Sequence, residues 1–114
     1  MTCTFKVPHW SRDVEKKKPH HDLANIKETF STFERLRITE TALTFAKLEL
    51  RLEDDDLVAL VQSVERSHFY KSMTAKNNHR IWQDVYHVPY ESRVLYVKIT
   101  ADADGYLLIS LKEK

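Results

Sequence analysis

The sequence has little of what several large classes of protein require. It contains a single glycine and a single cysteine, and its longest unbroken apolar run covers only residues 57–61. A membrane-spanning helix needs about 20 apolar residues, a phosphate-cradling loop needs closely spaced glycines, and an internal disulfide needs a second cysteine. These shortages argue against a membrane-spanning helix, most nucleotide-binding loops and a disulfide-stabilised fold.

Signals for secretion, metal binding and covalent catalysis are also missing. Residues 1–10 hold no long apolar stretch, so we expect no secretory signal and a cytoplasmic protein. The chain has no G-x-S-x-G motif and no catalytic-cysteine signature. The group His20-His21-Asp22 lacks the further ligands that zinc sites use, so we expect a hydrogen-bonded or solvated histidine pair. We therefore predict no metal, no cofactor and no membrane partner.

Length and charge indicate one domain of ordinary globular composition. The chain has 114 residues, of which 42% are hydrophobic and 31% are charged, and its formal net charge is +1. Residues 66–114 carry eight Lys and Arg residues against five Asp and Glu residues. This mild basic excess is compatible with a phosphate-rich partner but does not by itself indicate one.

The N-terminal residues differ from the rest of the chain. Residues 1–18 show no apolar period and end in the charged run Glu-Lys-Lys-Lys at 15–18. We therefore expect a flexible tail over residues 1–18 and a folded domain over residues 19–114. The lysine run has two interpretations, a solvated leader or an electrostatic arm for RNA.

Three segments in the N-terminal half have the periodicity of amphipathic helices. Asp22 can cap the first, and either Thr39 or Thr41 can cap the second. The acidic run 54–56 precedes the third, and we expect it to begin a helix rather than bind a metal, because carboxylates stabilise the N-terminal end of a helix. The apolar positions are Leu23, Ile26, Phe30 and Phe33, then Ala42, Leu43 and Ala46, then Leu57, Leu60, Val61 and Val64.

The C-terminal third changes to the pattern of β-strands. Three runs, 81–88, 94–100 and 106–111, are rich in aromatic and β-branched residues. Asp104-Gly105 between the last two runs is typical of a hairpin turn, in which Gly105 can adopt a positive φ. Helices followed by an antiparallel sheet indicate an α+β domain, with N-terminal helices packed on the C-terminal sheet.

Alternation along the last two runs separates a core face from a surface face. Leu95, Val97 and Ile99 are expected to face the core, and the side chains between them point the other way. If the hairpin turns at Asp104-Gly105, the polar sides of both runs form one surface, although the sequence leaves the cross-strand register open. The expected surface holds Tyr96, Lys98, Ser110 and Lys112, while Gln83 and His87 share a face of the preceding run.

Four sequence blocks occur in a characteristic order and spacing. They are Phe-Tyr-Lys-Ser-Met-Thr at 69–74, His-Arg-Ile-Trp-Gln-Asp-Val-Tyr at 79–86, Val-Lys-Ile-Thr at 97–100 and Ser-Leu-Lys-Glu-Lys at 110–114. In this order they closely resemble the MqsR family, the motility quorum-sensing regulator toxins. The resemblance covers roughly residues 18–114.

The resemblance implies a fold, an activity and partners. MqsR proteins have a RelE-like α+β fold and are mRNA interferases, endoribonucleases that need neither a metal nor the ribosome. They cut single-stranded mRNA at short GC-containing sequences. A cognate antitoxin, which binds zinc and DNA, neutralises the toxin. The pair represses its own transcription, and the toxin reaches the operator DNA only through the antitoxin. The family is linked to growth arrest, persistence and biofilm formation.

The resemblance also implies site residues. The family often has a histidine just after Lys-Ile-Thr, whereas this chain has Ala-Asp-Ala-Asp at 101–104, so no role of that histidine carries over. Where the motifs match, the catalytic residues are Lys71, Gln83, Tyr96 and Lys112, and the candidate substrate-binding residues are Tyr70, Met73, His79 and Lys98.

Metal-free RNA cleavage, which the resemblance implies, uses the 2′-hydroxyl of the substrate as nucleophile. The protein must then supply a base, an acid and positive charge for the phosphorane. Lysines can provide that charge, and Tyr96 can serve as base, acid or oriented donor. Gln83 cannot titrate and can only hydrogen-bond to a base edge or a phosphate oxygen. Unpaired bases can stack on aromatics such as Tyr70 or Tyr86.

Each of these residues also has a simpler interpretation. Lys71 and Lys112 can be solvated surface charges, Tyr96 and Gln83 ordinary sheet residues. His79 can contact RNA or cap a turn, and Tyr70 and Met73 can pack in the core or touch substrate. An alternative function is therefore a non-catalytic RNA-binding or regulatory module on the same fold, and a third is a purely structural partner of an antitoxin-like protein.

Overall fold

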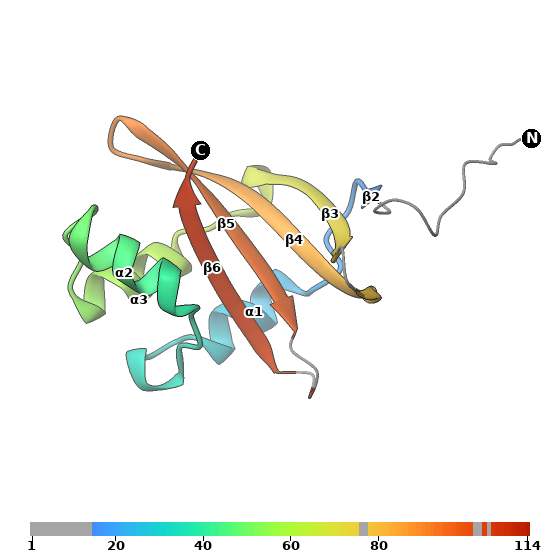
Figure 1. The fold of residues 1–114 in the computed structure, drawn as a ribbon, viewed down its shortest axis with the longest axis horizontal. Coiled ribbons are helices and arrows are strands. Elements are labelled where there is room, and N and C mark those ends of the chain that lie inside the picture. Colours follow the sequence, from blue (N-terminus) through green and yellow to red (C-terminus); the bar gives the residue numbers. More distant parts are fainter. Residues whose placement is uncertain (1–14, 76–77, 102–103, 105) are drawn as a thin grey trace, which may run out of the picture.

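The α+β class predicted from the sequence is confirmed by the computed structural model, which describes residues 15–75, 78–101, 104 and 106–114 (Figure 1). None of the helices in these ranges is long and apolar enough to cross a membrane. The helical elements of the described residues are α1 (Leu23–Thr29), η2 (Phe33–Arg35), α2 (Glu40–Leu48), α3 (Asp54–Gln62) and η3 (Arg66–His68), where η marks a 3-10 helix. The strands are β2 (Glu15–Lys16), β3 (Phe69–Ala75), β4 (Asn78–Tyr90), β5 (Arg93–Ala101) and β6 (Leu107–Glu113).

The starts of α2 and α3 follow the capping residues in the sequence. Thr39 precedes α2, and its side chain accepts a hydrogen bond from the backbone N–H of Ala42 at 3.2 Å. At the start of α3, the Asp56 carboxylate accepts a hydrogen bond from the backbone N–H of Glu53 at 2.9 Å. Both bonds satisfy backbone donors that the first helical turn leaves unpaired. The acidic run therefore begins a helix, as predicted.

The strands form one antiparallel sheet with the order β2-β3-β4-β5-β6. The register of β5 and β6, which the sequence left open, places Tyr96 opposite Lys112 and Lys98 opposite Ser110. The predicted common surface of these four side chains is thus confirmed. The edge of β6 is partly covered, because Ile38 forms an isolated bridge with Ile109. The predicted turn residue Gly105 lies outside the described residues.

The core combines helix side chains with alternate side chains of the strands. Leu95, Val97 and Ile99 are at most 1% exposed, which confirms the core face predicted for this strand. Burial of apolar surface against the sheet is the main force that fixes the helices there. The helical contribution to the buried cluster comes from Ile26, Ala42, Ala46, Leu57, Leu60 and Val61, and the strand contribution from Tyr86, Val88, Leu95, Val97, Ile99, Ile109 and Leu111.

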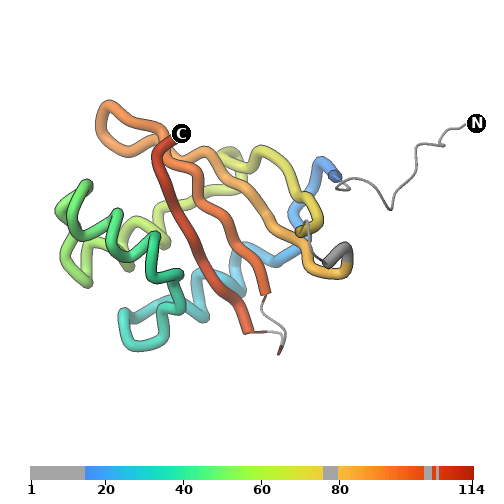
Figure 2. The backbone as a smooth tube through the Cα atoms, in the orientation of Figure 1, coloured from blue at the N-terminus to red at the C-terminus, as the bar shows by residue number. Residues whose placement is uncertain are grey.

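Three local predictions were incomplete or wrong. Strand β3 was not predicted as a strand, because its residues mix polar and apolar types without clear alternation. Residues 15 and 16, assigned to a loose tail, instead form β2, which pairs with β3 at Ser72 and Met73; Figure 2 shows this blue segment beside the yellow strand. Helix α1 begins after Asp22 as expected, but the Asp22 side chain forms no capping hydrogen bond, and the helix ends at Thr29, so Phe33 lies in η2 rather than on the first helix.

Candidate functional site

A β-bulge in β3 brings two neighbouring side chains to the same face of the sheet. Phe69 pairs with Tyr86 and Lys71 pairs with Val85, so β3 advances two residues while β4 advances one. The extra residue is Tyr70. Without a bulge, Tyr70 and Lys71 would point to opposite faces. With it, both side chains line one cavity on the face opposite the core.

This cavity of about 250 Å³ gathers most of the residues that the sequence motifs singled out. Three of the four candidate catalytic residues line it, namely Lys71, Tyr96 and Lys112. The candidate substrate-binding residues Tyr70, Met73 and Lys98 line it as well, together with the apolar Val85. Residues from β3, β4, β5 and β6 thus converge on one hollow of the sheet.

The two remaining candidates lie elsewhere. Gln83 is on β4 opposite Met73, which lines the cavity, but Gln83 itself does not line it. Gln83 shares a face of β4 with Val85, which lines the cavity, because alternate strand residues point to the same side. The side chain of His79 lies outside the described residues.

Lys71 is held by a carboxylate from the N-terminal strand. Its ammonium Nζ donates a hydrogen bond to Oε2 of Glu15 at 2.7 Å, and the Lys71 side chain is 20% exposed. This hydrogen bond raises the pKa of Lys71, against the smaller opposing effect of burial. Lys71 is therefore a cation at neutral pH, suited to stabilising negative charge rather than to accepting a proton.

A row of three aromatic rings crosses the strands beside the cavity. The ring centroids of Tyr70 and His87 are 4.3 Å apart and nearly parallel at 23°. Those of His87 and Tyr96 are 4.8 Å apart at 33°. A lysine ammonium lies over each outer ring, Lys71 at 5.4 Å from the centroid of Tyr70 and Lys112 at 5.8 Å from that of Tyr96.

His87 was not among the candidates from the sequence. The available signal was its shared face with Gln83 on β4, but its contacts depend on the bulge at Tyr70 and on its pairing with Tyr96. Burial lowers the pKa of His87, and the nearby charge of Lys114 lowers it further. His87 is therefore neutral at pH 7.

The other face of β4 holds a structural polar group. The carboxylate of Asp84 is fully buried and accepts hydrogen bonds from the hydroxyl of Ser72 at 2.7 Å and from the backbone N–H groups of His20 and His21. The His20 ring stacks on Trp82 with centroids 5.4 Å apart. The histidine pair is thus hydrogen-bonded and packed, as predicted, and within the described residues no group of three or more His, Cys, Asp and Glu side chains could hold a metal.

The expectation that Tyr86 could stack on a substrate base is wrong. Tyr86 is fully buried on the core face, and its ring centroid is 5.5 Å from that of Phe69. Burial, followed by the charge of Asp84, raises the pKa of Tyr86 to about 12. Its hydroxyl therefore stays protonated, and its ring is inaccessible to RNA. Among the aromatic rings that line the cavity, Tyr70 is 46% exposed and therefore accessible to solvent.

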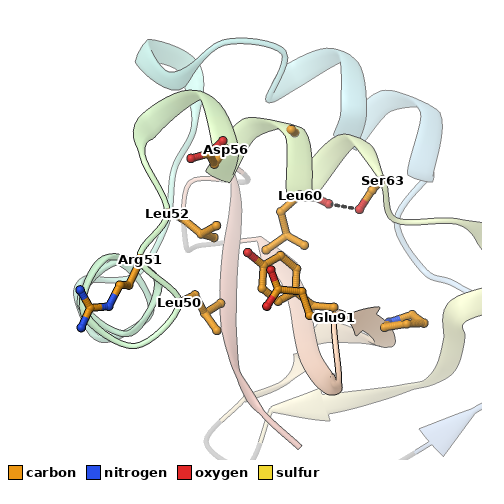
Figure 3. Close-up of a pocket in the computed structure, with 10 residues that line it drawn as sticks. Leu50, Arg51, Leu52, Asp56, Leu60, Ser63 and Glu91 are labelled. Carbon is orange, nitrogen blue, oxygen red and sulfur yellow. Dashed lines mark hydrogen bonds between the residues drawn. The ribbon is translucent and has the colours of Figure 1, made fainter.

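A larger hollow of about 510 Å³ lies between the α2–α3 connection and the β4–β5 turn (Figure 3). Its lining combines leucines with the carboxylates of Asp56 and Glu91 and the single cation of Arg51. Two carboxylates against one cation disfavour a polyanionic ligand. The smaller hollow, with Lys71, Lys98 and Lys112, is the better site for nucleic acid.

Comparison with known proteins agrees with these observations. The family model described as "Motility quorum-sensing regulator, toxin of MqsA" matches residues 18–113. The chain is 39% identical over 101 residues to a protein of Escherichia coli (strain K12) named mRNA interferase toxin MqsR, and the match covers 89% of this chain and 100% of that relative. The chain therefore belongs to the MqsR family of motility quorum-sensing regulator toxins.

Proposed function

We propose that this chain is a toxin that cleaves mRNA, acting on single-stranded regions as an endoribonuclease without a metal and without the ribosome. The observation that carries the proposal is the convergence of Lys71, Lys98, Lys112 and Tyr96 on one cavity. The relative named an mRNA interferase toxin supports mRNA as the substrate. Short GC-containing sequences are the proposed cleavage sites.

The proposed reaction is an intramolecular transesterification. The 2′-hydroxyl of one nucleotide loses its proton, and its oxygen attacks the adjacent phosphorus in line. The bond from phosphorus to the 5′-oxygen of the next nucleotide breaks, and that oxygen takes up a proton. The products are a 2′,3′-cyclic phosphate and a 5′-hydroxyl. Two unit charges become concentrated on the phosphorane oxygens, so fixed cations that surround them accelerate the step.

The geometry suggests distinct work for each side chain. Lys71 and Lys112 supply the positive charge, since Glu15 keeps Lys71 protonated and Lys112 stands on the far side of the cavity. The Tyr96 hydroxyl exchanges a proton with the reacting oxygens. An unpaired base stacks on the exposed ring of Tyr70, while the Gln83 amide hydrogen-bonds to a base edge or phosphate.

Fold and partners belong to the same proposal. The core shared between N-terminal helices and the C-terminal sheet supports a RelE-like arrangement of one domain. We infer a cognate antitoxin that binds zinc and DNA, neutralises the toxin in the cytoplasm and alone contacts operator DNA for autoregulation. Growth arrest, with its consequences for persistence and biofilm formation, then follows from mRNA loss. The family description, a toxin of MqsA, supports the antitoxin.

The test is cleavage of a defined single-stranded RNA by the purified chain in excess EDTA, with the fragment ends mapped to single nucleotides. Cleavage that persists in EDTA and clusters at GC-containing sites is expected. Loss of cleavage on chelation, with recovery in Mg²⁺, would overturn the metal-free mechanism.

A non-catalytic RNA-binding or regulatory module on the same fold is the second candidate. The feature in its favour is the Ala-Asp-Ala-Asp sequence at 101–104, where the family often has a histidine. In the same assay such a module would retard the RNA in a native gel yet leave it intact. Cleavage by the wild-type chain that Lys71→Ala abolishes would contradict this alternative.

A further inference from the structure

His87 stands at the centre of the ring row, although it does not line the cavity itself. It lies on β4, between β3, which carries Tyr70, and β5, which carries Tyr96. The two tyrosines come from strands on opposite sides of β4, so the imidazole lies between their rings. The centroid of the His87 ring is 4.3 Å from that of Tyr70 and 4.8 Å from that of Tyr96. Both tyrosines line the cavity. The placement of the two rings that form its wall therefore depends on the ring between them.

We propose that His87 is a positioning residue, a neutral flat ring that sets the spacing of Tyr70 and Tyr96 and so fixes the wall against which RNA binds and reacts. This inference rests on the proposed function, because it assigns His87 a part in the same cleavage site. Correct placement matters for rate, since a displacement of about 1 Å can cost on the order of 10²-fold. His87 contributes shape, and the proton transfers remain with residues that touch the substrate.

The surroundings of His87 favour the neutral imidazole. Its Nε2 is buried and has no hydrogen-bond partner among the described residues, so an added proton would find no acceptor there. The strands around His87 bring cations and phenol groups close to the imidazole. These groups are Tyr70 and Lys71 on β3, Tyr96 and Lys98 on β5, Lys112 on β6 and Lys114 after β6. The Glu15 carboxylate is hydrogen-bonded to Lys71.

Protonation of His87 would add a further positive charge to this lysine-rich row. Burial and Lys114 lower the pKa of His87, so folding favours the uncharged ring. The unfolded chain binds this proton at higher pH than the folded chain does. Stability from the neutral ring is therefore complete above the ordinary histidine pKa of about 6.5. It is lost as the pH falls from that value through the lower folded pKa, and we expect the ring row and the cleavage rate to be lost with it.

The variant His87→Phe separates shape from proton chemistry, because phenylalanine keeps a flat ring that cannot titrate. We expect His87→Phe to cleave one RNA at pH 7.5 within about 3-fold of wild type and to lack the fall in rate that the wild type shows below the ordinary histidine pKa of about 6.5. His87→Ala, which removes the ring, is expected to cleave the RNA at least 10-fold more slowly than wild type at every pH. If His87→Ala fails to fold, His87→Leu, which keeps bulk without a flat ring, takes its place.

His20→Phe is the matched control. His20 also stacks on an aromatic ring, Trp82, and burial lowers its pKa too, but it lies on the opposite side of the sheet. Its rates and pH profile should equal those of wild type. A folded His87→Phe chain as slow as His87→Ala would overturn the positioning role, because the imidazole itself would then be needed. Cleavage at the wild-type rate by a folded His87→Ala or His87→Leu chain would overturn the positioning role as well.

A second readout does not depend on cleavage. NMR resonances of the Tyr70 and Tyr96 rings should shift with pH as His87 titrates in the wild type and stay constant in His87→Phe. If wild-type protein leaves RNA intact while these resonances shift as expected, the proposed function fails, and only the placement of the Tyr70 and Tyr96 rings by His87 stands. If RNA is cut but the ring resonances ignore His87, the positioning role fails alone.

Discussion

Removing the Lys71 ammonium should slow RNA cleavage far more than it weakens folding. Lys71 lines the cavity and forms an ion pair with Glu15, a carboxylate that is 49% exposed. Such partly exposed pairs contribute about 0–1 kcal/mol to the free energy of unfolding. Lys71→Ala should therefore lower the free energy of unfolding by less than about 1 kcal/mol.

The effect on the chemical step should be larger. Removing one preorganised donor from a developing oxyanion costs about 3 kcal/mol, which corresponds to about 10²-fold in rate. Lys71 is held protonated by Glu15, so its full charge is present when the phosphorane forms. We therefore expect Lys71→Ala to reduce the single-turnover cleavage rate about 100-fold at neutral pH.

Single-turnover cleavage of one RNA and thermal unfolding of the same preparations measure both quantities. Lys47→Ala is the matched control, because Lys47 also forms an ion pair, with Asp54, but lies on α2 away from the cavity. Its cleavage rate should equal that of wild type. A folded Lys71→Ala chain that cleaves at the wild-type rate, or an equal loss in Lys47→Ala, would refute the role assigned to this charge.

Three further predictions concern the same site, the core and the cell. Tyr96→Phe keeps the ring beside His87 and deletes only the hydroxyl, so cleavage should fall about 10²-fold with an unchanged melting temperature; an unchanged rate would remove Tyr96 from the chemistry. Val97→Ala, at a position 1% exposed, should lower the free energy of unfolding by roughly 1–3 kcal/mol in denaturant titration, while the folded fraction cleaves normally. Induction of the wild-type chain alone should arrest bacterial growth and deplete mRNA, and co-expressed antitoxin should restore growth; unaffected growth would favour the non-catalytic module.

The features that follow from local periodicity could be predicted from the sequence. Alternation along β5 separated Tyr96 and Lys98 from the buried residues next to them. Capping chemistry located the start of α3 and narrowed the cap of α2 to Thr39 or Thr41. These features depend on neighbours within a few residues, which is the range over which sequence patterns carry information. The cavity itself required the register of β5 and β6, which the sequence alone did not supply.

The features that depend on contacts distant in sequence could not be predicted. Strand β2 has only two polar residues, and it forms because β3 offers an open edge. The bulge at Tyr70 shifts the faces of β3 and so decides that Lys71 enters the cavity. In β4 both faces carry apolar side chains, so alternation did not show that Tyr86 is buried. The position of His87, whose ring lies at the centre of the ring row, could not be predicted for the same reason.

The most direct test of the account concerns the chemical form of the RNA ends. Fragments from digestion by the wild-type chain in EDTA can be separated, and their termini identified by mass spectrometry. Attack by the 2′-hydroxyl predicts a 2′,3′-cyclic phosphate on each upstream fragment and a 5′-hydroxyl on each downstream fragment. A 3′-hydroxyl upstream with a 5′-phosphate downstream would show that water, not the RNA, is the nucleophile, and would contradict the mechanism proposed for Lys71, Tyr96 and Lys112.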